Sequence, residues 1–371
     1  MVINNMRKTL ILSTQPIGET NTSAFVRTSK FLTNKLNNVT LIDRDFEMYR
    51  EPFDNIIVAY GTFYADFKKM MMFMETHKDK RFIYMINEYG LVPNGDIYRF
   101  LIKNNYDVIA NYVEGSSGAK HYKKWYIINT NISALKEISN VTPFANRPKD
   151  LIYWGRYRPD REEYFKKYLH DCIVSTSQKN EDFFLRLKQK IKLITTVSFD
   201  ENSFLNLTKF TIYIEDKYTH THYNHLADRF YEALSFGIIM FFDMNAKNTV
   251  KLSGYDISDF YFVKDYKDLK AKMEEVNKDP EFYLKNLERL KEQAKKEQEN
   301  SLKEFDRVLQ LEQEQPTIDC PYCKAKAYSL KTCVSCSKKI CSNCFQIHKK
   351  FYCKECFDKV NTRVDKQMTL F

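Results

Sequence analysis

Residues 224–243, NHLADRFYEALSFGIIMFFD, combine two patterns that together decide the fold. In a helix that begins near the first residue of this stretch, His225, Arg229 and Glu232 share one stripe. The chain then turns at Gly237 into a strand that is apolar throughout. Such strands are typical of parallel sheets, which helices cover on both faces. The stretch therefore predicts one helix-to-strand unit of an α/β domain.

Further short apolar runs, separated by helical segments, lie on both sides of this stretch. Before residue 145 they occur at 9–14, 39–45, 55–60, 81–87 and 106–112, and after it at 151–155, 172–176, 192–197, 210–216 and 260–263. We predict two successive Rossmann-like halves, because buried strands alternate with helices in each series. No GxGxxG motif occurs, which gives little support to a dinucleotide-binding oxidoreductase.

The predicted domain organisation has five parts. They are an N-terminal Rossmann-like acceptor domain over 1–145, a Rossmann-like donor domain over 146–284, a charged helical linker over 285–317, a two-zinc module over 318–360 and a tail over 361–371. The linker begins after Asp279-Pro280, a helix-start signal, and carries a narrow apolar line.

Bulk composition indicates a globular protein. Hydrophobic residues make up 43% of the 371 and charged residues 29%. No apolar run is long enough to cross a bilayer, and no signal-peptide cleavage pattern is present, so we expect a cytoplasmic protein without membrane contact. The formal charge of +10 is a sign of a polyanionic partner. The sign is modest because most of the charge lies in residues 318–371, which hold eleven basic residues against four acidic ones, and zinc-bound cysteine thiolates in this segment would offset part of it.

The loop before the 224–243 helix follows a strand that ends in IED, so it lies at the carboxyl edge of the sheet, where α/β proteins bind ligands. There the helix N-terminus and Arg229 suit a diphosphate, and Glu232 can accept hydrogen bonds from sugar hydroxyls. The alternative is a surface ion pair between Arg229 and Glu232.

A second basic segment, YWGRYRPDREEYF at 153–165, follows the first strand of the second half. Gly155 allows a close approach of the backbone to a ligand. Arg156, Arg158 and Arg161 suit a diphosphate. The alternative is a basic helix start whose arginines pair with the acidic residues of the same segment, Asp160, Glu162 and Glu163.

GRYRPDR followed some seventy residues later by HLADRFYEALSFGIIMFFD resembles the donor domain of GT-B glycosyltransferases. The likeness is strongest to the bacteriophage enzymes that glycosylate hydroxymethylated pyrimidines in DNA, and it is best over 151–243. It implies a nucleotide-sugar donor, a UDP-sugar in the first place, with a divalent cation such as Mg²⁺ compatible with it. The residues implied at the diphosphate are Gly155, Arg156, His225 and Arg229, and Glu232 is implied at the ribose.

The sequence departs from the retaining members of that family in one respect. Many of them carry two glutamates eight residues apart, whereas the position eight before Glu232 is Asn224. Retaining and inverting chemistry both stay open. A general base for the acceptor hydroxyl is expected at a strand end of the first half. We favour Glu88, with Glu19 second and Asp43 and Asp45 as further candidates, while His220 and His222 fit a polar loop better than a metal site.

Eight cysteines cluster near the C-terminus in four CxxC pairs, and the ninth, Cys172, stands alone. Each pair supplies two thiolates to a tetrahedral ion, so the cluster predicts two structural Zn²⁺ ions. The spacing resembles RING and FYVE cross-brace modules, with ligation by neighbouring pairs as the alternative, and it does not by itself support ubiquitin-ligase activity. The ligands are Cys320, Cys323, Cys333, Cys336, Cys341, Cys344, Cys353 and Cys356.

The tail ends in KQMTLF, where Gln367, Leu370 and Phe371 resemble the peptide by which replication proteins dock on sliding clamps. The alternative is a frayed terminus.

We therefore expect a glycosyltransferase that moves a hexose or pentose to a hydroxymethylated pyrimidine in DNA, in a host cytoplasm if a phage encodes it. Two alternatives stay open: a glycosyltransferase acting on polysaccharide or protein, and a non-enzymatic DNA or clamp adaptor with degenerate Rossmann domains.

Overall fold

The computed structural model of the chain describes residues 6–13, 24–43, 49–59, 67–77, 79–86, 107–110, 124–194, 198–215 and 225–311, together with short strands beyond 317. Two compact units are present, Met1–Leu311 and Glu312–Phe371. The first unit contains two six-stranded sheets.

All strands of the first sheet are parallel, in the order β2-β1-β3-β4-β5-β6. They are β1 (Thr9–Ser13), β2 (Val39–Asp43), β3 (Asn55–Ala59), β4 (Arg81–Ile86), β5 (Asp107–Ala110) and β6 (Lys124–Ile127), with helices α1 (Ala24–Lys35) and α3 (Phe67–Thr76) between them. Five of these strands were predicted from their apolar runs. The sixth, β6, was missed because its sequence, KWYI, begins with a charged residue and is short.

The second sheet is also parallel, in the order β12-β11-β10-β7-β8-β9. Its strands are β7 (Lys149–Trp154), β8 (Cys172–Ser175), β9 (Ile191–Ile194), β10 (Thr208–Tyr213), β11 (Ile239–Asp243) and β12 (Phe262–Val263). Among its described residues, the helices are α5 (Glu162–Tyr168), α6 (Glu181–Arg186), α8 (Asp228–Ser235), α9 (Lys247–Leu252) and α10 (Tyr266–Lys278). The prediction of two parallel-sheet α/β halves is confirmed.

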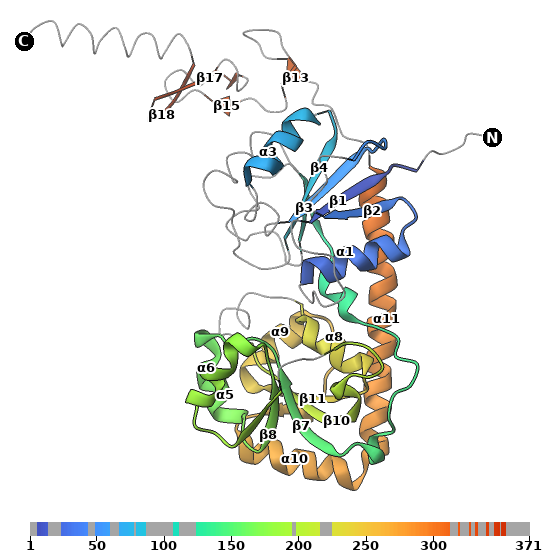
Figure 1. The fold of residues 1–371 in the computed structure, drawn as a ribbon, viewed down its shortest axis with the longest axis vertical. Coiled ribbons are helices and arrows are strands. Elements are labelled where there is room, and N and C mark those ends of the chain that lie inside the picture. The colour runs from blue at the N-terminus through green and yellow to red at the C-terminus, as the bar shows by residue number, and fades with distance from the viewer. Residues whose placement is uncertain are drawn as a thin grey trace, which may run out of the picture. The chain divides into compact units, whose positions relative to one another are not determined.

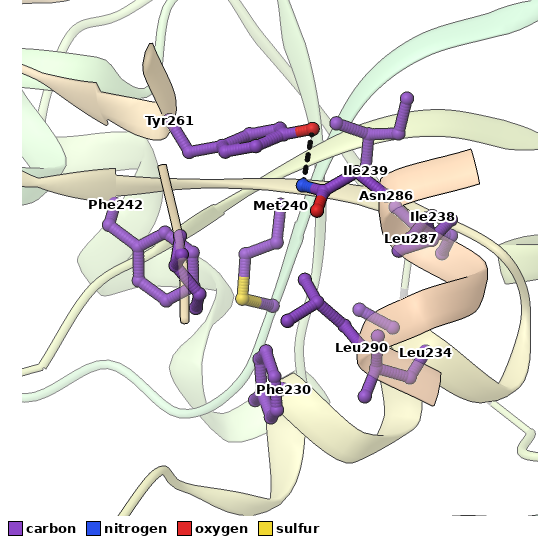
Figure 2. Close-up of a pocket in the computed structure, with 12 residues that line it drawn as sticks. Phe230, Leu234, Ile238, Ile239, Met240, Phe242, Tyr261, Asn286, Leu287 and Leu290 are labelled. Carbon is purple, nitrogen blue, oxygen red and sulfur yellow. Dashed lines mark hydrogen bonds between the residues drawn. The ribbon is translucent and has the colours of Figure 1, made fainter. Parts of the chain in front are cut away.

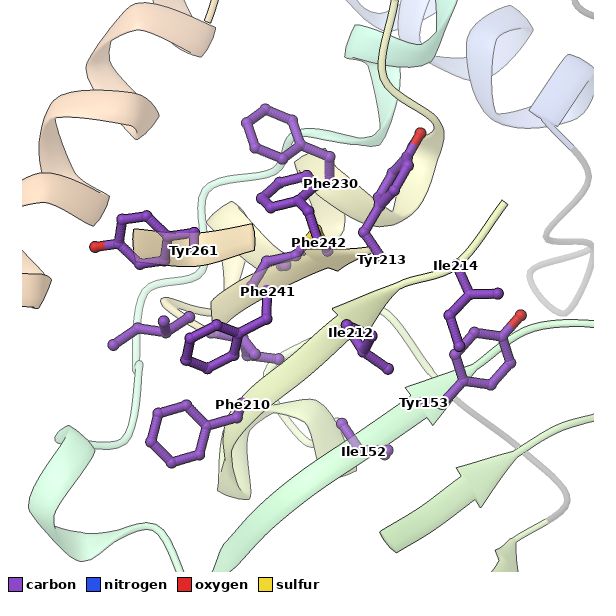
Figure 3. Packing of buried hydrophobic residues seen from close by; sticks show 14 of the residues in the cluster. Ile152, Tyr153, Phe210, Ile212, Tyr213, Ile214, Phe230, Phe241, Phe242 and Tyr261 are labelled. Atoms are coloured by element: carbon purple, nitrogen blue, oxygen red, sulfur yellow. The ribbon is translucent and has the colours of Figure 1, made fainter. Parts of the chain in front are cut away.

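The core of the second half is unusually aromatic (Figure 3). Tyr213 packs against Phe242 with ring centroids 5.3 Å apart, and Phe144 meets the edge of Phe210 at 5.6 Å. A small void of about 20 Å³ lies between α8, β11 and the long helix α11, which spans Pro280–Gln310 (Figure 2). Its lining is apolar apart from one Asn286–Tyr261 hydrogen bond of 3.0 Å, so it is a packing defect rather than a binding site.

The helix over 224–243 begins later than the sequence suggests. α8 starts at Asp228, with Ala227 in an extended conformation before it, so the expectation of a start near Asn224 is wrong. The amide of Ala227 donates to the Tyr213 hydroxyl at 3.0 Å, which holds the preceding residues outside the helix. The predicted glycine turn is confirmed, because Gly237 has a φ of +63° and a backbone bond from Ile238 N to Ala233 O closes the helix end.

A single long helix, α11 (Pro280–Gln310), joins the two cores. Leu287, Leu290 and Ala294 belong to the core of the second half, whereas Phe305 and Val308 belong to the core of the first. Figure 1 shows this helix running beside both sheets. The apolar line predicted for this helix is therefore buried. The helix was predicted as a linker, but it also fastens one half to the other.

The carboxyl end of α11 is held by polar residues of the first sheet. Asn55 Nδ2 donates to Leu309 O at 2.8 Å, and the buried Arg81 guanidinium donates to Val308 O at 2.5 Å while pairing with Asp107. A cation at this end also complements the helix dipole.

We expect Phe305→Ala to lower the free energy of unfolding by about 3–5 kcal/mol, because it removes a fully buried ring from the contact between α11 and the first sheet. Urea denaturation measures this. Lys303→Ala, two residues earlier on the exposed side of the helix, is the control and should stay within about 0.5 kcal/mol of the wild type. Equal stabilities for the two variants would show that α11 does not fasten the first half.

Candidate functional site

The strand order of the second sheet creates a crevice at one place. β7 and β10 lie side by side, and the chain continues from them to opposite edges of the sheet, which makes their carboxyl ends the topological switch point. Gly155 follows β7, and Ile214 and Glu215 follow β10. Helix α8 begins close by and brings Arg229 into this crevice.

Arg229 bridges the ends of both strands. Its Nε donates to Trp154 O at 2.9 Å, and one terminal nitrogen donates to Ile214 O at 3.0 Å. The guanidinium lies 4.6 Å from the centre of the Tyr153 ring, a cation–π distance. These contacts fix the start of α8 at the carboxyl ends of β7 and β10, and they hold the Arg229 guanidinium in the crevice.

Two arginines share one carboxylate in the crevice. Glu215 is buried between two arginines: it accepts from Arg229 at 3.3 Å and forms an ion pair with Arg161. One carboxylate between two guanidinium groups leaves a net positive charge in a desolvated place, which suits an anionic ligand. The sequence prediction noted the strand end IED but assigned no role to Glu215.

Gly155 meets Arg229 directly. Its φ is +150°, and a Cβ at this position would lie 2.7 Å from a terminal nitrogen of Arg229. Because it lacks a Cβ, the glycine lets the guanidinium lie directly against the backbone at the end of β7. Arg156 is exposed. Arg158 is half exposed and pairs with Asp160 at 2.6 Å, so the helix-start alternative describes Arg158 but not the buried Arg161.

We expect Gly155→Ala to weaken binding of a nucleoside diphosphate by about 10-fold or more, since the new methyl group would displace the Arg229 fork by a steric clash and strain the backbone. Isothermal titration with UDP measures this. Gly254→Ala is the control, because Gly254 also has a positive φ, +79°, but a Cβ there meets no atom within 4 Å. Equal UDP affinity in both variants would contradict a ligand at the Gly155 edge.

Glu232 lies one turn further along α8 and is buried. Its Oε2 accepts from Trp154 Nε1 at 2.6 Å, and its Oε1 is paired with Arg27 of helix α1. Arg229 pairs with Glu215 instead. The alternative of an exposed Arg229–Glu232 surface pair is therefore wrong. Trp154 and Arg27 were not identified from the sequence.

His225 precedes α8 and lines a cavity of about 380 Å³ that also involves Asn129, Tyr231 and Glu297. Tyr231 follows Arg229 by two residues in α8, so the two side chains project about 200° apart around the helix axis. Asn129 Nδ2 donates to the Tyr231 hydroxyl at 2.7 Å and to Glu297 at 2.6 Å. The cavity is thus polar and lies on a different face of α8 from Arg229, and the role of His225 at a diphosphate stays a prediction.

Asp228 is the first residue of α8, and burial raises its pKa from about 3.8 to about 6. Arg27 opposes this rise, while Glu232 and Glu215 add to it. Between these two pKa values the folded protein holds a proton that the unfolded chain releases, so Asp228 makes stability fall as the pH rises from about 4 to 6. We expect Asp228→Asn to remove this dependence, which urea unfolding at both ends of the window would measure. An identical pH dependence in both proteins would contradict it.

Several predicted residues lie outside the described part of the chain. They include the candidate bases Glu19, Glu88 and Asp45, the histidines His220 and His222, the tail residues Gln367, Leu370 and Phe371, and every zinc cysteine except Cys353, of which only the backbone is described. Asp43 ends β2, but its side chain is not described either. Among the described residues no group of three or more His, Cys, Asp or Glu side chains could hold a metal ion, and no helix could cross a membrane.

No protein-family model matches the chain, and no curated protein does. Solved structures do match. T4 phage β-glucosyltransferase in complex with UDP-glucose superimposes with a TM-score of 0.62 and 14% identity, over 82% of this chain and 100% of that one. An α-glucosyltransferase bound to UDP-glucose and DNA gives a TM-score of 0.59 at 11% identity, over 82% and 99%. Anabaena HepE in complex with UDP and glucose gives 0.51 at 10%, again over 82% and 99%.

The chain has the fold of these glucosyltransferases. This is the two-domain GT-B arrangement that the motif resemblance implied, with two parallel sheets and the long helix α11. At such low identity the likeness shows the fold, and the activity has to be argued from the side chains.

Proposed function

We propose that the chain is a glycosyltransferase that moves a sugar from a nucleotide-sugar, in the first place a UDP-sugar, to a hydroxyl group. One observation carries this proposal: at the switch-point crevice the guanidinium of Arg229 lies against Gly155, and Glu232 lies one turn further along the same helix. The diphosphate would lie at the start of α8, where free backbone N–H groups and Arg229 meet it, with Arg156 as a further cation. Glu232 would accept hydrogen bonds from the ribose.

In the proposed reaction the acceptor oxygen forms a bond with the anomeric carbon of the sugar while the bond from that carbon to the diphosphate oxygen breaks. The electron pair leaves with the nucleoside diphosphate, whose growing charge Arg229 and the α8 amides stabilise. The acceptor proton passes to a carboxylate of the first half, for which Glu88 is our first candidate and Glu19 our second. A divalent cation such as Mg²⁺ would add to the neutralisation of the diphosphate.

The cavity beside His225 supports a place for the transferred sugar. The described residues that line it include no lysine or arginine, so it suits a neutral group better than a phosphate. Amide, hydroxyl and carboxylate groups of Asn129, Tyr231 and Glu297 are the kinds of partner that sugar hydroxyls need.

For the acceptor we propose a hydroxymethylated pyrimidine base in DNA, flipped out of its stack into the cleft. The fold shared with phage DNA-modifying glucosyltransferases and the formal charge of +10 support this. Acceptor binding should then weaken steeply between low and moderate salt, because phosphate contacts release counterions. Weak salt dependence would favour the rival acceptors, polysaccharide or protein.

The C-terminal unit supports a proposal of two structural zinc ions. Strands β13 (Ile318–Asp319) and β14 (Lys326–Ala327) pair antiparallel, and the segment between them contains Cys320 and Cys323. Strands β15 (Lys331–Thr332) and β16 (Lys339–Ile340) bracket the next CxxC pair in the same way. Elemental analysis should find two zinc ions per chain, and finding none would refute the assignment.

We also propose that the tail residues Gln367, Leu370 and Phe371 dock on a sliding clamp, which would couple modification to DNA synthesis. Deletion of the last five residues should abolish clamp binding without changing turnover on free DNA.

Donor binding tests the enzymatic proposal against the non-enzymatic adaptor. Isothermal titration of the purified chain with UDP-glucose, UDP and other nucleoside diphosphates should show saturable binding of at least one of them. The adaptor predicts no binding to any of them and no effect of Arg229→Ala on function.

A further inference from the structure

The side chain of Arg27, a residue of the first half, makes its ion pairs with residues of the second half. Arg27 belongs to α1, which packs against the short 3-10 helix η3 (Thr130–Ala134). The hydroxyl of Thr28, next to Arg27, lies 3.3 Å from Thr130 O and 3.0 Å from the Ser133 hydroxyl, and both contacts are buried. The position of α1 beside the second half is therefore fixed next to Arg27.

The same 3-10 helix also holds the chain that leads into α8. Asn131 Nδ2 donates to Leu226 O at 3.0 Å, and this bond is buried. Helices α1 and α8 thus rest on one common support, which brings the guanidinium of Arg27 to the start of α8.

The guanidinium of Arg27 forms two ion pairs with α8. One terminal nitrogen contacts Asp228 and the other contacts Glu232, while the carbon of the guanidinium lies 5.5 Å from the ring centre of Phe199. The Arg27 side chain is only 15% exposed, and that of Glu232 is 5% exposed. Contacts this well buried are screened little by salt and depend on good geometry.

Without Arg27, α8 would present two carboxylates of like charge to each other. Asp228 and Glu232 are four residues apart, so they share one helix face. Two carboxylates in a partly buried place resist ionising together, and one of them tends to keep its proton. The neighbouring cation Lys136 is exposed and donates to the carbonyl oxygen of Phe199 at 3.0 Å, so it is a weaker substitute. Arg27 is therefore the cation that offsets the charge of both carboxylates.

The pairing leaves Glu232 able to bind a ligand. An ionised carboxylate has about four sites for accepting hydrogen bonds, two on each oxygen. Arg27 uses one on Oε1 and Trp154 Nε1 uses one on Oε2. Counting the contacts of the described residues, one site per oxygen is left, which matches two neighbouring hydroxyls such as the 2′ and 3′ hydroxyls of a ribose. Arg27 and Trp154 together fix the plane of the carboxylate.

We propose that Arg27 is a positioning residue that the first half contributes to the donor site of the second: it holds the Glu232 carboxylate oriented for the two hydroxyls of the nucleotide ribose. This inference rests on the proposed function. It follows that ribose recognition requires the two halves to be in contact, so donor binding and approach of the acceptor half are coupled through one side chain.

Titration of UDP and 2′-deoxy-UDP into the wild type and three variants tests this. We expect Arg27→Ala to bind UDP at least about 10-fold more weakly, because a charge-assisted contact to the ribose acceptor is lost. The preference for UDP over 2′-deoxy-UDP should also shrink toward one. Arg27→Lys should recover part of the UDP affinity and part of the preference for UDP, because lysine keeps the positive charge but lacks the two terminal nitrogens of the guanidinium. In the Arg27→Ala background, Asp228→Asn should restore part of the UDP affinity by removing the like charge.

Arg289→Ala is the matched control, since Arg289 also pairs with an aspartate, Asp256, but on the exposed side of α11. Its UDP affinity and ribose preference should equal those of the wild type. The inference is overturned if Arg27→Ala keeps the wild-type preference for UDP over 2′-deoxy-UDP, or if it binds UDP more tightly, which would make Arg27 a competitor of the ribose. If the wild type itself binds no nucleoside diphosphate, the proposed function fails, and the inference fails with it.

Discussion

Arg229→Ala should abolish detectable donor binding and lower turnover by about 10²–10³-fold or more, because it removes the buried cation from the place where the leaving diphosphate gains charge. The same change leaves Trp154 O and Ile214 O without their donor and Glu215 with Arg161 alone. Breaking a buried ion pair costs about 3–5 kcal/mol, so the variant will also be less stable. Arg229→Lys should keep part of the fold stability but little of the activity, since an ammonium group cannot bridge both strand ends.

A second buried arginine separates stability from function. Arg147 also donates to backbone carbonyls, those of Thr142, Thr208 and Gly237, and burial lowers its pKa to about 10. Thr208 begins β10, whereas Ile214 follows its end, so Arg147 lies at the opposite edge of the sheet. Arg147→Ala should lose stability as Arg229→Ala does, yet keep the wild-type KM for the donor at a temperature where it is folded. Loss of donor binding in both variants alike would reduce Arg229 to a structural residue.

Glu232→Gln should weaken UDP binding by about 10–100-fold and remove the preference for ribose over deoxyribose, because the amide replaces one acceptor with a donor. Its NH₂ group would face either Arg27 or the indole N–H of Trp154, both of which are donors. One buried donor is then left without a partner, at a cost of about 1–3 kcal/mol in stability.

Titration with UDP and 2′-deoxy-UDP measures both effects, and thermal unfolding provides the stability. Glu292→Gln on α11, whose exposed carboxylate pairs with Lys295, is the control. Equal ribose preference in Glu232→Gln and the wild type would remove Glu232 from the donor site.

The strands were predictable because a strand that is buried on both faces has a continuous apolar run in its sequence. The runs at 9–14 and 238–243 have no polar face, and β1 and β11 are buried along their whole length. The narrow apolar stripe of α11 was equally easy to predict from its helical spacing. What the stripe could not reveal is that Leu290 and Phe305 belong to different cores, because both look alike in a helical pattern.

The site was only partly predictable for a similar reason. Arg229, Glu232 and Gly155 stood out by spacing and by their place at strand ends. Their partners did not, because Arg27 is 205 residues away from Glu232 along the chain, and Trp154 is 78 residues away. Such contacts arise only when both sheets and the 3-10 helix between them are assembled. The late start of α8 has the same origin, since the Tyr213 hydroxyl holds Ala227 outside the helix.

The most direct test of the account is transfer itself. Purified protein is incubated with UDP-glucose and related nucleotide-sugars on DNA containing hydroxymethylated pyrimidines, and the nucleosides are then weighed. The account predicts that one pairing of donor and base adds the mass of a single sugar to the modified nucleoside, and that Arg229→Ala adds none. Unchanged nucleosides with every donor and base, from protein that is folded and binds zinc, would contradict it.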